Sequence, residues 1–181
     1  DSTCDLSAEQ IKRHDIGIFP MSINMGERSL RDGLDITPDD IYAHVDAGGD
    51  ICTTSALNIA DYTDRFAALS GAYDAVIHIN ISAEFSSCYQ NAVLAAQEFP
   101  NVYVVDSRNL STGHGHVVLR AAELAEAGMA PEDIVRELNA FTAKVDASFI
   151  LSRLDYMKKG GRCSSVVALG ANLLHLRPCI E

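Results

Sequence analysis

Two stretches of the sequence concentrate hydroxyl groups directly before predicted helices. They are Thr53-Thr54-Ser55-Ala56-Leu57-Asn58 and Ser82-Ala83-Glu84-Phe85-Ser86-Ser87-Cys88-Tyr89-Gln90. The first amides of a helix are unpaired and carry partial positive charge, so hydroxyls beside them can help to hold an anion. Serine and threonine also cap helices without a ligand, and Ser87 and Gln90 have the spacing of a capping box. Spacing alone favours capping, whereas two such starts in one chain add weight to a carboxylate or phosphate site.

The second cluster also contains two candidate nucleophiles, the Ser86 hydroxyl and the Cys88 thiol. Either could serve an enzyme that acts on an acyl or phosphoryl substrate. Such an enzyme needs a base beside its nucleophile. The sequence contains no Gly-x-Ser-x-Gly elbow, and its spacing assembles no set of Cys, His and Asp. The pattern therefore favours binding, with a Ser86 or Cys88 enzyme as the alternative hypothesis.

Two glycine-containing segments are open to more than one interpretation. Ser111-Thr112-Gly113-His114-Gly115 lacks the lysine of a P-loop, so its glycines favour close helix packing or a turn. His114 and His116 diverge by about 200° on a helix and do not predict a shared metal ion. Lys158-Lys159-Gly160-Gly161-Arg162 fits a left-handed helix cap and, equally, an anion contact through Arg162. We predict no metal site.

The elements that position these groups alternate between strands and helices. Apolar, β-branched runs predict short strands, and helical spacing with capping residues predicts the helices. The predicted strands are residues 16–19, 75–81, 102–105 and 149–151, and the predicted helices are residues 37–47, 58–69, 89–99, 117–127, 131–141 and 154–159. This alternation predicts an α/β fold with a parallel or mixed sheet and helices on its faces. Ligands of such sheets bind where strand ends meet helix N-termini.

Composition narrows the classes of partner. The chain has 181 residues, 48% of them hydrophobic, and its 14 basic and 25 acidic side chains give a formal net charge of -11. Binding to nucleic acid or an anionic membrane surface uses clustered Lys and Arg, and the sequence has no such cluster. No apolar run approaches the roughly 20 residues that span a bilayer. Five scattered cysteines without a Cys-x-x-Cys pair predict reduced, mostly buried thiols. We expect a soluble, cytoplasmic protein.

The two ends of the sequence are typical of a fragment. The chain starts with the polar step Asp1-Ser2-Thr3, and it stops at Glu181 after the strand-like residues 176–180. We therefore expect that a short first strand and a larger C-terminal piece are missing.

Seven segments, in order along the chain, form a pattern that resembles one protein family. They are Asp1-Ser2-Thr3-Cys4-Asp5-Leu6, Phe19-Pro20-Met21, Thr54-Ser55, residues 82–92, Val105-Asp106-Ser107, Gly113-His114-Gly115 and residues 154–162. The first resembles the D-S-T-x-D-L opening of the DegV family of bacterial fatty-acid-binding proteins, and residues 82–92 are similar to its S-S-x-L-S-G-T-Y-Q-S-A motif. The resemblance covers essentially the whole chain.

This resemblance implies a carrier and not a catalyst. Such a protein holds one long-chain fatty acid between two α/β lobes, with the tail buried and the carboxylate at the hydroxyl-rich loops. It presents the carboxylate to a separate ATP-dependent subunit, the catalytic subunit of a fatty acid kinase, which makes the acyl phosphate. No cofactor is implied other than the bound fatty acid. By position, the carboxylate ligands are Thr54 and Ser86, supported by Ser55 and Ser87. The secondary candidates are Ser82, Cys88 and Arg162.

The chain departs from the family pattern in both hydroxyl clusters. Ala56-Leu57 stands where the family has Gln-Pro, and Ser86-Ser87-Cys88 stands where it has Ser-Gly-Thr. Ser87 in place of glycine adds a side chain beside the ligand, which either supplies another hydroxyl or narrows the site. A third hypothesis is therefore a short, polar site for another small anion.

Overall fold

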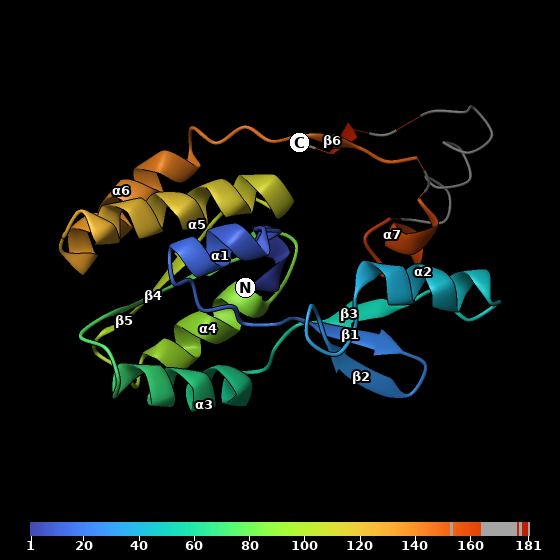
Figure 1. The fold of residues 1–181 in the computed structure, drawn as a ribbon, viewed down its shortest axis with the longest axis horizontal. Helices are drawn as coiled ribbons and strands as arrows, with labels where there is room; N and C mark the ends of the chain where they lie inside the picture. Colours follow the sequence, from blue (N-terminus) through green and yellow to red (C-terminus); the bar gives the residue numbers. More distant parts are fainter. Residues whose placement is uncertain (153, 164–176, 178, 181) are drawn as a thin grey trace. The chain divides into compact units, whose positions relative to one another are not determined.

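The computed structural model describes residues 1–152, 154–163, 177, 179 and 180, which fall into two compact units (Figure 1). Unit 1 comprises Asp1–Phe19 and Ala56–Val145. Unit 2 comprises Pro20–Ser55 and the described part of Asp146–Glu181. One boundary lies between Ser55 and Ala56, so the hydroxyls of the first cluster (Thr53, Thr54 and Ser55) belong to unit 2, while the second cluster lies wholly in unit 1.

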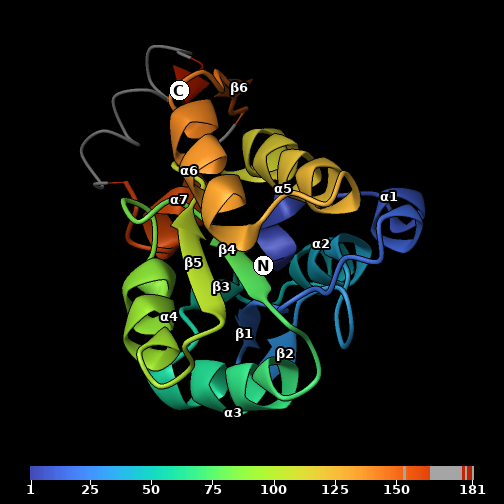
Figure 2. The same ribbon diagram turned by 90° about the vertical axis from the view of Figure 1, so that its left-hand side faces the viewer.

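Unit 1 is built on two parallel strands. β4 (Val76–Asn80) pairs with β5 (Val102–Asp106), with Val76 opposite Val102 and Asn80 opposite Asp106. Its helices are η1 (Ser2–Cys4, a 3₁₀ turn), α1 (Ala8–Arg13), α3 (Ile59–Ser70), α4 (Cys88–Ala96), α5 (Ser111–Glu126) and α6 (Pro131–Thr142). Figure 2 shows α3 and α4 on one side of the strands and α5 and α6 on the other. The predicted α/β class is confirmed.

Alternation along β4 explains this layering, since successive side chains of a strand point to opposite faces. His78 packs against the rings of Phe19, Tyr62 and Phe66, with ring centroids 4.4, 5.4 and 5.5 Å away. Ile79 joins the opposite cluster, which contains residues of α5 and α6. Burial lowers the pKa of His78 well below its ordinary value, so its ring is neutral and packs as an aromatic side chain.

Unit 2 contains a small antiparallel sheet in the order β2-β1-β3. β1 (Ser22–Met25) and β2 (Arg28–Arg31) form a hairpin whose turn places Gly26 at a φ of 60°, a conformation that favours glycine. β3 (Thr53–Ser55) pairs with β1, with Thr54 opposite Ile23. The other elements of unit 2 are α2 (Pro38–Asp46), β6 (Phe149–Ile150), α7 (Asp155–Lys159) and β7 (Cys179–Ile180).

Local signals located most helices correctly. Thr37 and Asn58 each complete a capping box at the starts of α2 and α3. Gly161 has a φ of 76°, and the Arg162 amide donates to Met157 O at 2.8 Å, so the left-handed cap predicted after α7 is confirmed. The predicted strand at residues 149–151 is confirmed in part by β6, whereas Leu176 and Pro178 of the strand-like end lie outside the described residues.

Two predictions about elements were wrong. Residues 16–19 form no strand; instead the Ile16 amide bonds locally to Ile11 O and Phe19 O accepts the Ser2 amide. Residues 53–58 lead into α3 as predicted, and within them residues 53–55 form the unpredicted strand β3, because pairing with β1 satisfies their backbone. The predicted start of a helix at residue 117 was too late, since α5 begins at Ser111.

The first turns of α5 make a close backbone contact with η1. A Cβ atom on Gly115 would lie 2.6 Å from Cys4 O, so α5 approaches η1 more closely than any side chain permits. The prediction that this segment's glycines permit close helix packing is therefore confirmed at Gly115.

Adding one methyl group at this contact should destabilise unit 1. We expect Gly115→Ala to lower the free energy of unfolding by about 1–3 kcal/mol, because the clash is with backbone that must shift. Gly71→Ala is the matched control, since its Cβ would come no closer than 3.7 Å to Ala67 O. The measurement is urea denaturation; equal stability of the two variants would contradict the contact.

The five cysteines differ in burial. None of the five cysteines forms a disulfide. Cys4 and Cys88 are buried, Cys52 and Cys163 are half-buried and Cys179 is exposed, so burial is less general than predicted. In the part of the chain that the structure describes, no helix is long and apolar enough to cross a membrane.

Candidate functional site

The carboxyl ends of β4 and β5 carry two loops that are tied together. The loop after β4 contains Ser82–Ser87, and the loop after β5 leads from Ser107 to α5. The Ser82 amide donates to Asn109 O at 3.0 Å, and the Ala83 amide donates to Asp106 Oδ1 at 3.2 Å. The second hydroxyl cluster is thus held at the strand edge where ligands of parallel sheets bind.

Ser82 closes the turn that carries the other hydroxyls. Its carbonyl accepts the amides of Phe85 at 3.0 Å and Ser86 at 3.3 Å, and its Oγ accepts the Glu84 amide at 3.3 Å. The residue is only 4% exposed. Ser82 therefore builds the turn, and its hydroxyl is turned to the backbone.

Ser86 caps α4 through its side-chain oxygen. Its Oγ accepts the Cys88 amide at 3.3 Å and so caps α4. The residue is half-buried, and its hydroxyl hydrogen has no acceptor among the described residues. A hydroxyl that accepts from a helix amide can still donate its hydrogen to an anion. Capping and anion binding are therefore compatible at Ser86.

The capping box predicted from Ser87 and Gln90 is wrong. Ser87 is the N-cap residue of α4, but its side chain makes no capping hydrogen bond. Its ψ of 1° differs from the extended backbone that lets a cap side chain reach the helix amides. Ser87 is exposed, so its hydroxyl is accessible from solvent.

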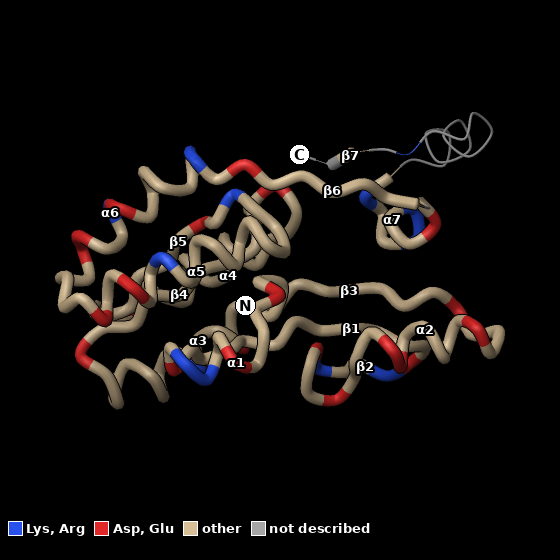
Figure 3. Tube along the Cα trace, turned by 45° about the horizontal axis from the view of Figure 1, so that its top comes forward, with Lys and Arg blue, Asp and Glu red and all other residues tan. Residues whose placement is uncertain are grey.

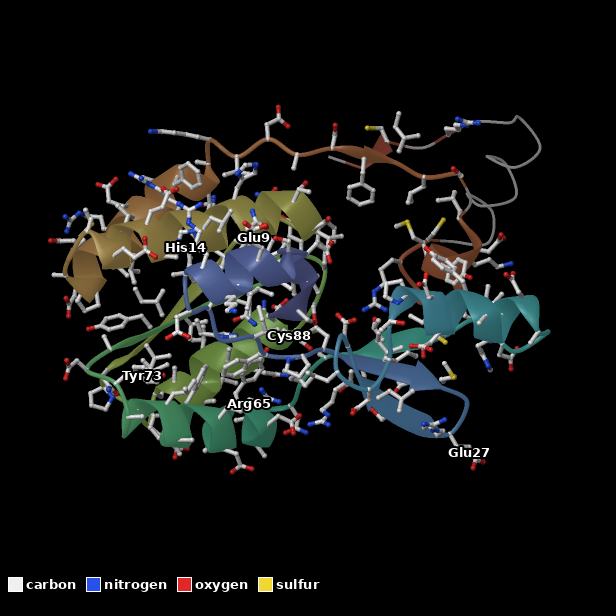
Figure 4. The ribbon with its side chains drawn as sticks, viewed as in Figure 1. Glu9, His14, Glu27, Arg65, Tyr73 and Cys88 are labelled. Carbon is white, nitrogen blue, oxygen red and sulfur yellow. The ribbon has the colours of Figure 1, made fainter. Side chains whose placement is uncertain are left out.

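Cys88 lies inside unit 1 and not at its surface. Figure 4 shows it among the interior side chains, and its exposed fraction is 0%. Burial, reinforced by the Cys88 thiol, raises the pKa of Tyr62, whose hydroxyl also accepts from Asn80 Nδ2 at 3.0 Å. A substrate or ligand reaches Cys88 only if the core opens.

The hydroxyls of the first cluster lie in unit 2, on the outer strand β3. Thr54 is exposed, and its hydroxyl bonds to no described residue. The Ser55 hydroxyl accepts from Asn24 Nδ2 at 3.2 Å across the β1–β3 pair. Arg162, also in unit 2, is exposed and its guanidinium donates to Gly160 O, which keeps it beside its own helix cap.

Charge provides little positive potential for an anion. Figure 3 marks Asp and Glu residues along both units, with Lys and Arg residues scattered between them. With a net charge of -11, an anionic ligand depends on hydroxyls and helix amides more than on surplus cations. Within the described residues, no group of three or more His, Cys, Asp or Glu side chains is arranged to hold a metal ion.

A buried polar network behind the turn was not predicted. Asp1 Oδ2 accepts the Ile81 amide at 2.8 Å, and Asp1 Oδ1 lies 2.7 Å from the Thr3 hydroxyl. That hydroxyl lies 3.1 Å from His114 Nδ1, and His114 Nε2 lies 3.3 Å from Ile79 O. Burial lowers the pKa of His114 to about 3, so its ring is neutral. The sequence signal was the polar Asp1-Ser2-Thr3 step, whose partner His114 is remote in the chain.

A separate apolar groove of about 350 Å³ runs along β4 and α5 in unit 1. Its walls include Ile77, Ile79, Val118, Ala121, Met129 and Ile134. None of the predicted ligand hydroxyls lines it. The groove is therefore distinct from the hydroxyl-bearing turn at the strand edge.

Parallel strands ending in a hydroxyl-rich turn at a helix N-terminus are typical of α/β proteins that bind a small ligand at the sheet edge. Comparison with known proteins makes this specific. The DegV family profile matches residues 1–181. The chain belongs to the DegV family, as its seven motifs indicated.

Among curated relatives, the chain is 34% identical over 179 residues to the DegV domain-containing protein CPE1310 of Clostridium perfringens, covering 98% of this chain and 64% of the relative. It is 31% identical over 182 residues to the DegV domain-containing protein TTE1491 of Caldanaerobacter subterraneus, covering 99% of this chain and 65% of the relative. The chain thus spans slightly less than two thirds of the length of these proteins.

Solved structures of fatty-acid-binding proteins share the fold. The fatty-acid-binding DegV family protein from Thermus thermophilus has a TM-score of 0.84 at 34% identity, covering 98% of this chain and 64% of that one. A stearic-acid-binding protein from Eubacterium ventriosum has a TM-score of 0.83 at 29% identity, covering 99% and 65%. DegV from Bacillus subtilis, a fatty acid binding protein, has a TM-score of 0.84 at 28% identity, covering 98% and 64%.

Proposed function

We propose that this protein binds a long-chain fatty acid and holds its carboxylate with Thr54 and Ser86, supported by Ser55, Ser87 and the first amides of α4. The observation that carries the proposal is the Ser86 hydroxyl, which caps α4 through its oxygen and keeps its hydrogen available for an anion. The solved structures of similar proteins, which are fatty-acid-binding proteins, support the choice of ligand. The fatty acid is the only small molecule that the proposal requires.

The energetics divide between the tail and the headgroup. Burying about 15 methylenes at roughly 0.8 kcal/mol each contributes on the order of 12 kcal/mol before ordering costs are subtracted. A hydrogen bond from a hydroxyl to the carboxylate contributes about 1–3 kcal/mol. The tail therefore dominates affinity, and the hydroxyls set the position of the carboxylate.

We further propose that the protein is a carrier subunit that presents the carboxylate to a separate ATP-dependent fatty acid kinase. In that reaction a carboxylate oxygen attacks the γ-phosphorus of ATP, the bond to the leaving ADP breaks, and an acyl phosphate forms. Neutral hydroxyls suit this role, because a tight ion pair with a buried arginine would stabilise the ground state against attack. The deep burial of Cys88 argues against the thiol form of the alternative enzyme.

Loss of one hydroxyl that binds the headgroup should impair phosphoryl transfer more than it impairs retention of the fatty acid. We expect Ser86→Ala or Thr54→Ala to slow acyl phosphate formation by about ten- to a hundredfold, because one hydrogen bond to a charged oxygen is lost. Retention of the fatty acid through purification should change much less, since even a tenfold loss of affinity leaves the larger contribution of the buried tail in place. The measurements are kinase-dependent turnover of ATP and lipid content after purification.

The control for this experiment is Ser29→Ala, which removes an exposed hydroxyl on β2, outside the proposed site. It should leave both quantities unchanged. Equal loss of transfer and of lipid in the Ser86 and Thr54 variants would contradict the division between headgroup and tail. Product formation by the purified protein without a kinase would support the enzyme that uses Ser86 or Cys88 as its nucleophile.

A further inference from the structure

The two amides that flank Ser82 each donate to a carboxylate. The Ile81 amide donates to Asp1 Oδ2 at 2.8 Å, and the Ala83 amide donates to Asp106 Oδ1 at 3.2 Å. Asp1 and Asp106, together called the carboxylate bracket below, come from η1's cap and from the end of β5. The bracket therefore fixes the chain immediately before and immediately after the residue that closes the hydroxyl-bearing turn.

Each member of the bracket is itself held in place. Asp1 is 6% exposed and is tied through Thr3 to the buried His114. Asp106 is half-buried, and the same Oδ1 atom that accepts from Ala83 also accepts the Arg108 amide at 2.9 Å. One oxygen atom thus joins the loop after β4 to the loop after β5.

A chain of contacts leads from Asp106 to the proposed ligand atom. Asp106 fixes the Ala83 amide, Ser82 O accepts the Ser86 amide at 3.3 Å, and Ser86 Oγ accepts the Cys88 amide at 3.3 Å. In this series of hydrogen bonds, the negative charge of Asp106 does not act on the ligand. A second carboxylate near a bound anion instead opposes binding, so the useful property of Asp106 is its acceptor oxygen.

We propose that Asp106 is a positioning residue that sets the Ser86 hydroxyl for the fatty acid carboxylate, with Asp1 as its counterpart on the other side of Ser82. This inference rests on the proposed function, because it needs Ser86 to contact the carboxylate. Asp106, at the end of β5, thus contributes to recognition of the headgroup only by fixing the turn that carries Ser86.

The test compares Asp106→Ala with Asp106→Asn, which keeps an oxygen at the same position and removes the charge. Delipidated protein is titrated with stearate and with methyl stearate, which has the same tail but no anionic headgroup. We expect Asp106→Ala to weaken stearate binding about tenfold and methyl stearate binding less than twofold. Asp106→Asn should bind stearate at least as well as the wild type. In a Ser86→Ala background, Asp106→Ala should add less than a further threefold.

Three results would overturn the inference: wild-type stearate affinity in Asp106→Ala, equal weakening for both ligands, or independent losses in the double variant. Amide hydrogen exchange at Ala83 and Cys88 tests the turn without lipid, and both amides should exchange faster in Asp106→Ala but not in Asp106→Asn. Unchanged exchange would also overturn it. A wild-type protein that binds neither ligand would instead contradict the proposed function, while the exchange result would still test the role of Asp106.

Discussion

Replacing stearate by laurate is expected to weaken binding by roughly a thousandfold. The two ligands share a headgroup and differ by six methylenes, and each buried methylene contributes about 0.8 kcal/mol, where 1.4 kcal/mol is a factor of ten. The reason is physical: hydroxyls and helix amides provide a modest, orienting contribution in a chain of net charge -11. Isothermal titration of delipidated protein with a series of saturated fatty acids measures this dependence.

The same series distinguishes the carrier from a binding protein for another small anion. Acetate has the headgroup without the tail, so it should show no measurable binding at millimolar concentration. If acetate, laurate and stearate bound with similar affinity, the headgroup would dominate, and the site would be the short, polar one of the third hypothesis.

Removing the Phe66 ring should cause the largest loss of stability. Phe66 is fully buried, and its centroid lies 5.8 Å from that of Phe19, 5.7 Å from Tyr62 and 5.5 Å from His78. We expect Phe66→Ala to lower the free energy of unfolding by about 3–5 kcal/mol, because a cavity replaces a ring at the centre of the cluster. Urea denaturation followed by circular dichroism provides the measurement.

Leu94→Ala on α4 is the control, since Leu94 is 48% exposed and its loss should cost less than about 1 kcal/mol. A change below about 1 kcal/mol in Phe66→Ala would contradict its place at the centre of the core. Arg65, labelled in Figure 4, precedes Phe66 on α3, and its guanidinium lies 4.9 Å from the Phe19 centroid. Phe66→Ala therefore also removes packing from Phe19, the ring that the Arg65 guanidinium contacts.

Strong local signals made unit 1 largely predictable. Short stretches of sequence contain the apolar runs of β4 and β5, the Asn58 cap of α3 and the Pro131 start of α6. The sheet of unit 2 was not predicted, because β1 and β2 are only four residues long, mix polar with apolar side chains and are joined through Gly26-Glu27, not through a strong turn pair such as Asn-Gly. β3 is defined by its partner strand, and a pairing between residues so far apart leaves no local pattern.

The candidate hydroxyls could be identified from the sequence, whereas the contacts that hold them in place could not. Position at a helix start identified Ser86, and the structure adds that its oxygen caps α4. The roles of Asp1, His114 and Asp106 depend on tertiary contacts between residues remote in sequence, so spacing could not identify them. The Ser87 capping box failed because the cap backbone is not extended, a property of the turn that Ser82 closes.

The proposed function requires the protein to carry a long-chain fatty acid. Its most direct test is to extract the purified protein with organic solvent and determine by mass spectrometry what is released and how much. We expect one long-chain fatty acid per protein molecule. A protein that releases no lipid, and that takes up no stearate when it is offered, would contradict it.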